Sequence, residues 1–336
     1  MLKIGINGFG RIGRLITRII LKKYKGKIDL VCINTSGKID TSGWAHLFKY
    51  DTAYGKYEGK VSVRGNRMVV DGVNIPILGE REIEKIPWNK YRTDIVIEST
   101  GVFRKEEDAG KHLKGSVKKV VLSAPGKGGN IPMYVIGVNE KEMGKEKILS
   151  CASCTTNCVA PVTKVMDENF GVAKGFMSTI HAYTGDQRIL DGSHKDLRRG
   201  RAAAVNIIPT TTGAAKATGE VYPAVAGVFD GLAIRVPVIT ASLTDFTFVV
   251  KKKTSIEKVN QAFEKASQGK LKGILGVTRE PLVSSDIIGL ELSTLVDLSL
   301  TNVIKGDLIK VIAWYDNEWG YAERLVEEVV LAGEQL

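Results

Sequence analysis

The sequence lacks the features by which several classes of protein are recognised. No apolar run reaches the roughly 18 residues that a membrane-spanning helix needs. Residues 1–6 have the pattern of a strand rather than a signal peptide, so we expect neither membrane insertion nor secretion. Only four cysteines are present, and three of them fall within residues 151–158, which fits a reducing, cytoplasmic compartment better than a disulfide framework. Repeats, low-complexity tracts and proline-rich linkers are absent as well.

The charge balance is basic but shows no nucleic-acid-binding pattern. The chain has 48 Lys and Arg against 37 Asp and Glu, a formal net charge of +11. The basic residues are scattered, with groups at residues 22–27, 118–127 and 251–253, rather than regularly interleaved with aromatic side chains. We interpret them as a solvated surface that attracts small phosphorylated anions, with a nucleic-acid-binding protein as the non-enzyme alternative. With 336 residues, 43% of them apolar, the chain is expected to form two domains.

Residues 1–34 predict a dinucleotide-binding unit. A short apolar strand at residues 3–6 precedes Gly8-Phe9-Gly10-Arg11-Ile12-Gly13, a G-x-G-x-x-G motif. Apolar residues then recur at helical spacing through residue 21, and a second strand follows at residues 30–34. In that context the glycines let a pyrophosphate approach the helix N-terminus. The alternative is a tight turn that serves only helix–sheet packing.

Later segments predict the rest of the fold. Strands at residues 95–98 and 120–122 end in Ser99-Thr100-Gly101 and Ser123-Ala124, as expected where a parallel sheet meets a ligand. Short alternating runs predict inserted antiparallel strands at residues 60–63, 68–70 and 73–77. Beyond residue 150, strand patterns without regular crossover helices favour a mixed or antiparallel sheet, with strands at residues 174–181, 242–250, 293–300 and 310–314 and helices at residues 255–267 and 321–331.

The predicted fold class is therefore α/β. A Rossmann-type doubly wound dinucleotide-binding domain spans residues 1–152, and an α+β catalytic domain with a mixed or antiparallel sheet spans residues 153–318.

A nucleophile is predicted in the middle of the chain. The run Ser153-Cys154-Thr155-Thr156-Asn157-Cys158 follows an apolar strand pattern and indicates a helix start. There the unpaired N–H groups and the positive end of the helix dipole would lower the pKa of the Cys154 thiol from about 8.5 toward neutral. An ordinary buried helix start is the alternative. Zinc on Cys151, Cys154 and Cys158 is disfavoured because no fourth ligand is near.

His181 is the predicted partner of that thiol. It is one of only four histidines, and it ends a strand pattern in Ile180-His181-Ala182-Tyr183-Thr184. An imidazole beside Cys154 would form an ion pair with the thiolate and move protons to and from a substrate oxygen, although a structural histidine is the alternative. Arg199, the run Thr210-Thr211-Thr212-Gly213 and Arg235 add the arginine forks, hydroxyls and helix N–H groups that bind phosphate.

Five ordered segments resemble one family along the whole chain: residues 4–14, 153–158, 181–187, 210–216 and 314–321. The chain resembles phosphorylating glyceraldehyde-3-phosphate dehydrogenase. The resemblance implies that Cys154 attacks the aldehyde, that His181 acts as base, that hydride passes to NAD or NADP, and that inorganic phosphate opens the thioester to give 1,3-bisphosphoglycerate. The backbone N–H of Cys154 and His181 would stabilise the oxyanion.

The resemblance also assigns binding residues and partners. Thr184 and Arg235 would hold the C3 phosphate of glyceraldehyde 3-phosphate, and Arg199 would assist the groups that hold the attacking phosphate, which are Ser153, Thr155, Thr212 and Gly213. The implied assembly is a homotetramer, with residues 183–204 between subunits and the C-terminal helix, residues 319–336, packed on the coenzyme domain. No membrane or nucleic-acid partner is expected. The predicted coenzyme residues are Asn7, Gly8, Gly10, Arg11, Ile12, Gly13, Asn34, Thr35, Ser36, Arg81, Ser99, Thr100, Gly101, Ser123, Ala124, Ser193 and Asn317.

Two departures from the family pattern concern the coenzyme. NAD enzymes of the family usually carry Asn-Asp after the second strand, whereas this chain has Asn34-Thr35-Ser36. A carboxylate about 4 Å from a 2′-phosphate would repel it by roughly 4 kcal/mol at an effective dielectric constant of about 20. Ser193 also replaces a proline and matches the residue that NADP-using relatives place against that phosphate. We hypothesise that NADP is accepted and preferred; the alternative is neutral drift in an NAD enzyme.

Erythrose-4-phosphate dehydrogenase is the alternative enzyme, because it shares the architecture but releases its acyl group to water. The physiological direction, glycolytic or biosynthetic, and a redox role for Cys151 are not determined by the sequence.

Overall fold

The computed structural model describes residues 1–129 and 131–336, which form two compact units. The first unit contains Met1–Tyr134, Lys141–Ala152 and Ala322–Leu336, and the second contains Val135–Glu140 and Ser153–Tyr321. The sequence-based division placed residues 135–140 in the first domain. They belong to the second unit because Gly137 lies against Leu271 and Ile274.

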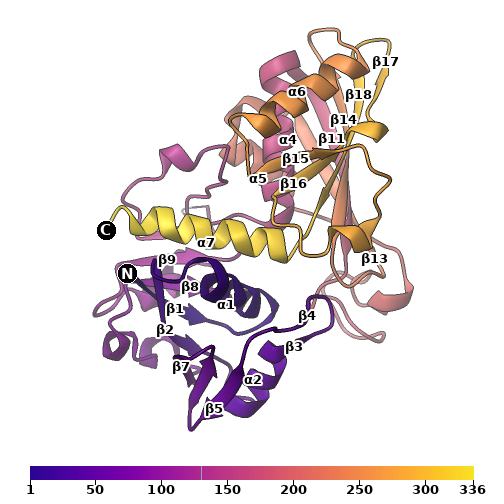
Figure 1. Ribbon diagram of the computed structural model, residues 1–336. Coiled ribbons are helices and arrows are strands. Elements are labelled where there is room, and N and C mark those ends of the chain that lie inside the picture. The colour runs from indigo at the N-terminus through magenta and orange to yellow at the C-terminus, as the bar shows by residue number, and fades with distance from the viewer. Residues whose placement is uncertain (130) are drawn as a thin grey trace. The chain divides into compact units, whose positions relative to one another are not determined.

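An eight-stranded sheet forms the centre of the first unit (Figure 1). The strand order is β10 (Ile148–Ser150), β9 (Lys119–Leu122), β8 (Ile95–Glu98), β1 (Leu2–Asn7), β2 (Ile28–Asn34), β7 (Val73–Leu78), β6 (Arg67–Val70) and β5 (Val61–Arg64). The strands from β10 to β7 in this order are parallel, and β6 and β5 extend the sheet as an antiparallel ribbon. This arrangement confirms the predicted Rossmann-type class.

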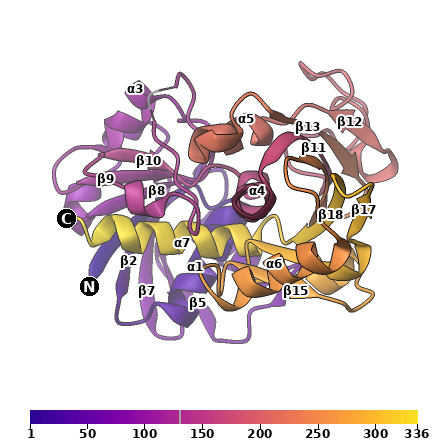
Figure 2. The same cartoon turned by 90° about the horizontal axis from the view of Figure 1, so that it is seen from above.

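The apolar pattern of the sequence explains this packing. Strands β8 and β9 are buried at every position, as expected for parallel strands covered on both faces. Helix α1 (Arg11–Lys23) buries Leu15, Ile16, Ile19 and Ile20 at helical spacing. It lies beside α7 (Trp319–Gly333), where Lys23 and Glu323 form a 2.7 Å ion pair within this unit (Figures 1 and 2). The first unit also contains α2 (Thr41–Lys49), α3 (Glu106–Ala109) and the pair β3 (Tyr50–Asp51) and β4 (Gly55–Lys56).

The second unit is built on a mixed sheet. The strand order is β12 (Ile208–Thr210), β13 (Phe229–Val236), β11 (Val172–Ala182), β14 (Ser242–Val250), β18 (Leu308–Tyr315), β16 (Thr294–Asp297) and β15 (Leu275–Thr278), and β17 (Asn302–Ile304) pairs with β18. Strands β11 and β13 are parallel, as are β15 and β16, and the other pairs are antiparallel. This sheet also agrees with the predicted class.

Three helices enclose the core of the second unit. Helix α4 (Cys154–Phe170) lies between α5 (Ala214–Val221) and α6 (Ile256–Gln268), as Figure 2 shows. Their apolar faces meet the aromatic side chains of β14, Phe246 and Phe248, in one buried cluster. This packing holds the first turn of α4 against the sheet.

One local prediction was incomplete and one was wrong. Residues 73–77 were expected to form an inserted antiparallel strand, which the pairing of β7 with β6 confirms, but β7 also pairs in parallel with β2. Residues 293–300 were expected to be one strand, but β16 ends at Asp297, whose side chain accepts a hydrogen bond from Ser299 N and starts a short 3-10 turn.

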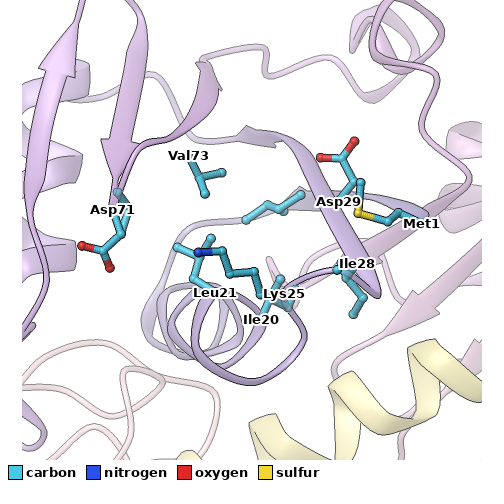
Figure 3. A pocket seen from close by; sticks show the side chains of 11 residues that line it. Met1, Ile20, Leu21, Lys25, Ile28, Asp29, Asp71 and Val73 are labelled. Atoms are coloured by element: carbon cyan, nitrogen blue, oxygen red, sulfur yellow. The ribbon is translucent and has the colours of Figure 1, made fainter.

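A small pocket of about 190 Å³ lies at the beginning of β2, between α1 and the β6–β7 hairpin (Figure 3). Its lining includes Met1, Lys25, Asp29 and Asp71, and it contains none of the predicted site residues. In the part of the chain that the structure describes, no helix is both long and apolar enough to cross a bilayer.

Candidate active site

Cys154 is the first residue of α4. Ser153 caps this helix, because its Oγ accepts a 3.1 Å hydrogen bond from Thr156 N. Cys154 is half-buried, whereas Cys32, Cys151 and Cys158 are buried. It is therefore the cysteine most open to a reagent or substrate.

The imidazole of His181 faces this thiol. His181 lies near the end of β11, and its Nε2 is 3.5 Å from Cys154 Sγ. Its Nδ1 lies 2.6 Å from the carbonyl oxygen of Ala182. Because a carbonyl can only accept, we assign the proton to Nδ1, which leaves the Nε2 lone pair directed at the thiol. Nε2 is thus placed to take the thiol proton.

Burial works against charge on both groups. Burial raises the pKa of the Cys154 thiol, and the Arg235 guanidinium opposes that rise. Burial, followed by the charge of Arg235, lowers the pKa of His181 to about 3. The sequence argument expected a lowered thiol pKa because it considered only the helix start. Both shifts favour the neutral thiol and the neutral imidazole, so Nε2 is free to take the thiol proton as Sγ attacks.

Tyr315 contacts both elements that carry this pair, and sequence reasoning did not identify it as a site residue. Its hydroxyl lies 3.0 Å from Thr155 Oγ1 and 2.8 Å from Thr179 Oγ1, and its ring meets the edge of His181 at 6.0 Å between centroids. It thereby joins α4 to β11. The only signal in the sequence was its place in the motif at residues 314–321.

Two groups that can bind an anion adjoin His181. Parallel pairing of β11 and β13 sets Arg235 opposite His181. Arg235 Nη1 donates to Ala182 O at 3.1 Å and to Thr184 Oγ1 at 3.3 Å, and its buried Nε has no partner among the described residues. Arg235 and Thr184 therefore form a cationic hydrogen-bonding pair next to the thiol, as phosphate requires.

Arg199 belongs to a neighbouring network. Its Nη1 pairs with Asp186 Oδ2 at 2.7 Å, and its Nε donates to Thr210 Oγ1 at 2.9 Å. Its charge acts on both His181 and Arg235. Thr212 and Gly213 directly precede α5, where the Thr212 hydroxyl accepts from Ala214 N at 3.2 Å. Asn317 Oδ1 accepts from Ser242 Oγ at 2.8 Å, which fixes its amide.

The glycine motif has the geometry of a dinucleotide turn. Gly8 has φ +100°, and a Cβ there would lie 2.7 Å from Thr100 N. A Cβ on Gly13 would lie 2.1 Å from Gly8 O, whereas one on Gly10 would meet nothing within 4 Å. Gly10 precedes α1 and gives it no side-chain cap, so the N-terminus of α1 can approach a pyrophosphate. These residues fit a dinucleotide coenzyme.

The remaining predicted contacts in the first unit lie in the loops that follow the parallel strands. Ser99 Oγ donates to Gly8 O at 2.7 Å, and Gly101 has φ +72°. Ser123 N donates to Glu98 O at 2.9 Å, and Ala124 O accepts from Ser150 Oγ at 2.8 Å. These loops therefore border the edge at which the glycine turn lies.

The residues after β2 that were expected to contact the coenzyme differ in one respect from the sequence expectation. Thr35 is 4% exposed and donates its hydroxyl proton to Leu78 O at 2.8 Å, so that proton is not available to a ligand. Ser36 and Arg81 are exposed, and Arg81 Nε donates to Ser36 O at 3.1 Å. Asp40 caps α2, and Asp29 lines the pocket of Figure 3 at the start of β2, so neither supplies the missing acid.

Ser193 lies on the exposed loop of the second unit, where its carbonyl accepts from Arg188 Nε at 2.8 Å. Over residues 1–129 and 131–336, no group of three or more His, Cys, Asp or Glu side chains could hold a metal ion.

Comparison with known proteins covers both units. Residues 2–106 match the family profile described as glyceraldehyde 3-phosphate dehydrogenase, NAD binding domain, and residues 153–317 match the C-terminal domain of the same family. The chain is 51% identical to glyceraldehyde-3-phosphate dehydrogenase 2 of Streptomyces avermitilis, over 100% of this chain and 99% of the relative. It is 52% identical to glyceraldehyde-3-phosphate dehydrogenase of Thermotoga maritima, over 98% of this chain and 99% of the relative. It is 50% identical to the chloroplastic form B of Pisum sativum, over 97% of this chain and 73% of the relative.

Replacement of His181 by Asn should slow alkylation of Cys154 by iodoacetamide at pH 7 by about tenfold or more, because no base then takes the thiol proton. The rate should also rise more steeply with pH than in the wild type, where Nε2 remains unprotonated down to about pH 3. His194→Asn is the matched control. Equal rates for His181→Asn and wild type would contradict the assigned base.

Proposed function

The chain belongs to the glyceraldehyde-3-phosphate dehydrogenase family, and from this we propose which of its residues carry out each step of the reaction. The protein is an NAD(P)-dependent dehydrogenase that converts glyceraldehyde 3-phosphate and inorganic phosphate to 1,3-bisphosphoglycerate, reversibly. The observation that carries the residue assignment is the 3.5 Å contact between Cys154 Sγ and His181 Nε2.

Cys154 is the nucleophile and His181 the base. As Sγ bonds to the aldehyde carbon, Nε2 accepts the thiol proton and passes it to the substrate oxygen, which gives a thiohemiacetal. The hydrogen bond from Nδ1 to Ala182 O holds the imidazole in the tautomer that this step requires. The backbone N–H of Cys154 belongs to the first turn of α4, where N–H groups have no intrahelical acceptor, and in this proposal it donates to the developing oxyanion.

The second half of the reaction uses the same two residues. A bound nicotinamide coenzyme supplies the hydride acceptor. As hydride leaves the thiohemiacetal carbon, Nε2 takes the hydroxyl proton and a thioester remains on Cys154. A phosphate oxygen then attacks the thioester carbon, the C–S bond breaks, and the proton on Nε2 returns to the sulfur.

Two phosphate sites surround the thiol in this proposal. Arg235 and Thr184 hold the C3 phosphate, supported by their mutual hydrogen bond and by the orphaned Nε of Arg235. Ser153, Thr155, Thr212 and Gly213 hold the attacking phosphate, with Arg199 nearby. The helix starts of α4 and α5 supply N–H groups for it.

In this proposal the coenzyme residues of the first unit lie in the glycine turn and in the loops after the parallel strands. Asn317 holds the nicotinamide carboxamide in this proposal, and its amide is fixed by Ser242. NADP is preferred because the acid that would repel a 2′-phosphate is absent, and because the exposed Arg81 guanidinium is held at the backbone of the exposed Ser36, where its Nε donates to Ser36 O. The Ser193 contact comes from another subunit.

Exposed aliphatic side chains in the loop at residues 183–204, and in the segment between this loop and β12, support self-association. They are Ile189, Leu190, Leu197, Val205 and Ile207, which are 70% to 85% exposed. Large exposed apolar side chains of this kind are typical of subunit interfaces. We propose a homotetramer in the cytoplasm, where a reactive thiol stays reduced. Light scattering that gives the mass of one chain would contradict it.

Reduction of NADP should require both glyceraldehyde 3-phosphate and inorganic phosphate, and Cys154→Ser should abolish turnover, because the hydroxyl cannot form and release the thioester. Absorbance at the reduced-coenzyme band measures both. Cys158→Ser is the control for thiol replacement. Reduction that continues without phosphate would indicate hydrolysis of the acyl group and contradict the proposed product.

Arg81→Gln should lower kcat/KM with NADP by about tenfold and change that with NAD by less than about twofold, since only NADP carries the 2′-phosphate that the guanidinium binds. Steady-state kinetics with both coenzymes measures the ratio. Arg64→Gln, at another exposed arginine of the same unit, is the control. An unchanged coenzyme ratio in Arg81→Gln would show that this contact is absent.

A further inference from the structure

A chain of buried polar side chains connects the carboxyl ends of three strands in the first unit. Glu98 Oε2 accepts from Asn7 Nδ2 at 2.6 Å and lies 3.0 Å from His112 Nε2. Asn7 Oδ1 in turn accepts from Asn34 Nδ2 at 2.8 Å. Glu98 and Asn34 are 2% exposed, Asn7 is 3% exposed and His112 is fully buried. Polar groups so deeply buried are costly unless each is paired.

The hydrogen-bond pattern determines where the protons lie in this network of buried side chains. Trp88 Nε1 donates to His112 Nδ1 at 3.0 Å, and an indole N–H can only donate. His112 Nδ1 is therefore the acceptor, and the proton of a neutral imidazole lies on Nε2, which donates to Glu98. Thr100 N donates to the other oxygen, Oε1, at 2.8 Å, and the Thr100 hydroxyl donates to it too. Glu98 is thus a buried carboxylate surrounded by neutral donors.

The carboxylate lies at the point in the sheet where the strand order reverses. Strand β1 stands between β2, which follows it in the chain, and β8, which comes later, and Asn7 and Glu98 are direct neighbours in the β1–β8 register. In open α/β sheets this position is where a ligand binds beyond the strand ends. The bond from Asn7 to Glu98 therefore spans the proposed coenzyme edge.

The groups held by Glu98 are the loops that carry the proposed coenzyme residues. Thr100 belongs to the loop after β8, and its N–H passes so close to Gly8 that a Cβ there would be 2.7 Å away. Asn7 ends β1 next to the glycine turn. Asn34 ends β2 and also binds the backbone of Glu80, which precedes Arg81. Asn34 Nδ2 donates to Glu80 O at 2.8 Å, and Asn34 Oδ1 accepts from Glu80 N at 3.0 Å.

We propose that Glu98 is a positioning residue for the coenzyme: its carboxylate holds the loops after β1, β2 and β8 in one arrangement before the coenzyme binds. It touches no coenzyme atom in this scheme and acts through Asn7 and Thr100. Preorganised loops need not be ordered during binding, so the carboxylate increases affinity. The inference rests on the proposed coenzyme site.

An amide cannot take the place of this carboxylate. In Glu98→Gln, an amide nitrogen that faced Asn7 and His112 would meet two donors. If the nitrogen instead faced Thr100, it would meet the backbone N–H. The substitution therefore leaves at least one buried donor unpaired in either orientation, while the volume of the side chain is almost unchanged.

Glu98→Gln should weaken binding of NADP, NAD and ADP-ribose by at least about tenfold in calorimetry, because loss of a charged hydrogen bond has that order of effect. The KM for coenzyme should rise similarly, with kcat at saturating coenzyme within about twofold of wild type. Alkylation of Cys154, which lies in the second unit, should keep its rate.

Glu146→Gln is the matched control. Glu146 also accepts from a hydroxyl and a backbone N–H, from Tyr134 at 2.9 Å and Gly144 at 2.8 Å, in the same unit. It should lower Tm without changing coenzyme affinity. If Glu98→Gln behaves in that way, Glu98 only stabilises the fold and the inference is overturned. If Glu98→Gln does not fold, His112→Leu, which removes one donor, should weaken binding by at least about threefold, and unchanged binding would overturn the inference.

Gly13→Ala separates this inference from the coenzyme site itself. Its Cβ would lie 2.1 Å from Gly8 O, so it disrupts the glycine turn. Loss of binding in Gly13→Ala together with normal binding in Glu98→Gln would refute the role of Glu98 alone. Normal binding in both variants would refute the proposed site.

Discussion

The contact between Cys154 and His181 depends on the meeting of a helix start with a strand end. Cys154 is placed by α4, which is capped by Ser153 and held by the core beneath it. His181 is placed by β11, whose parallel pairing with β13 also brings Arg235 alongside. Because the reactive pair is only 3.5 Å apart, a small shift of α4 along the sheet would separate base from nucleophile. The packing of α4 on the sheet is thus part of the chemistry.

Each unit has one buried polar residue, here called a hub, that joins the elements carrying its proposed site. Tyr315 joins Thr155 on α4 to Thr179 on β11 in the second unit, and Glu98 joins Asn7 to Thr100 in the first. Both hubs are almost fully buried, and both bind groups that carry proposed ligand contacts. Buried networks with every member paired are rigid, because any rearrangement leaves a polar group without a partner. Loops that must meet a ligand in fixed geometry benefit from that rigidity.

The structure also changes how the charges of the site are understood. A helix start favours a thiolate, but burial raises the pKa of Cys154 and lowers that of His181 to about 3. After β2, Thr35 uses its hydroxyl proton within the fold, and the exposed groups are Ser36 and Arg81. Both results depend on which atoms surround a side chain in space.

The sequence by itself determined the local elements and the reactive residue types. Apolar periodicity predicted β8 and β14 at their observed bounds, the glycine motif predicted the turn before α1, and the motif around Cys154 predicted a helix start. Those features depend on neighbours in the chain. Tertiary structure decided the parallel pairing of β7 with β2, the return of residues 135–140 to the second unit, and the hubs at Tyr315 and Glu98. These depend on contacts between residues distant in sequence, for which no local pattern carries the information.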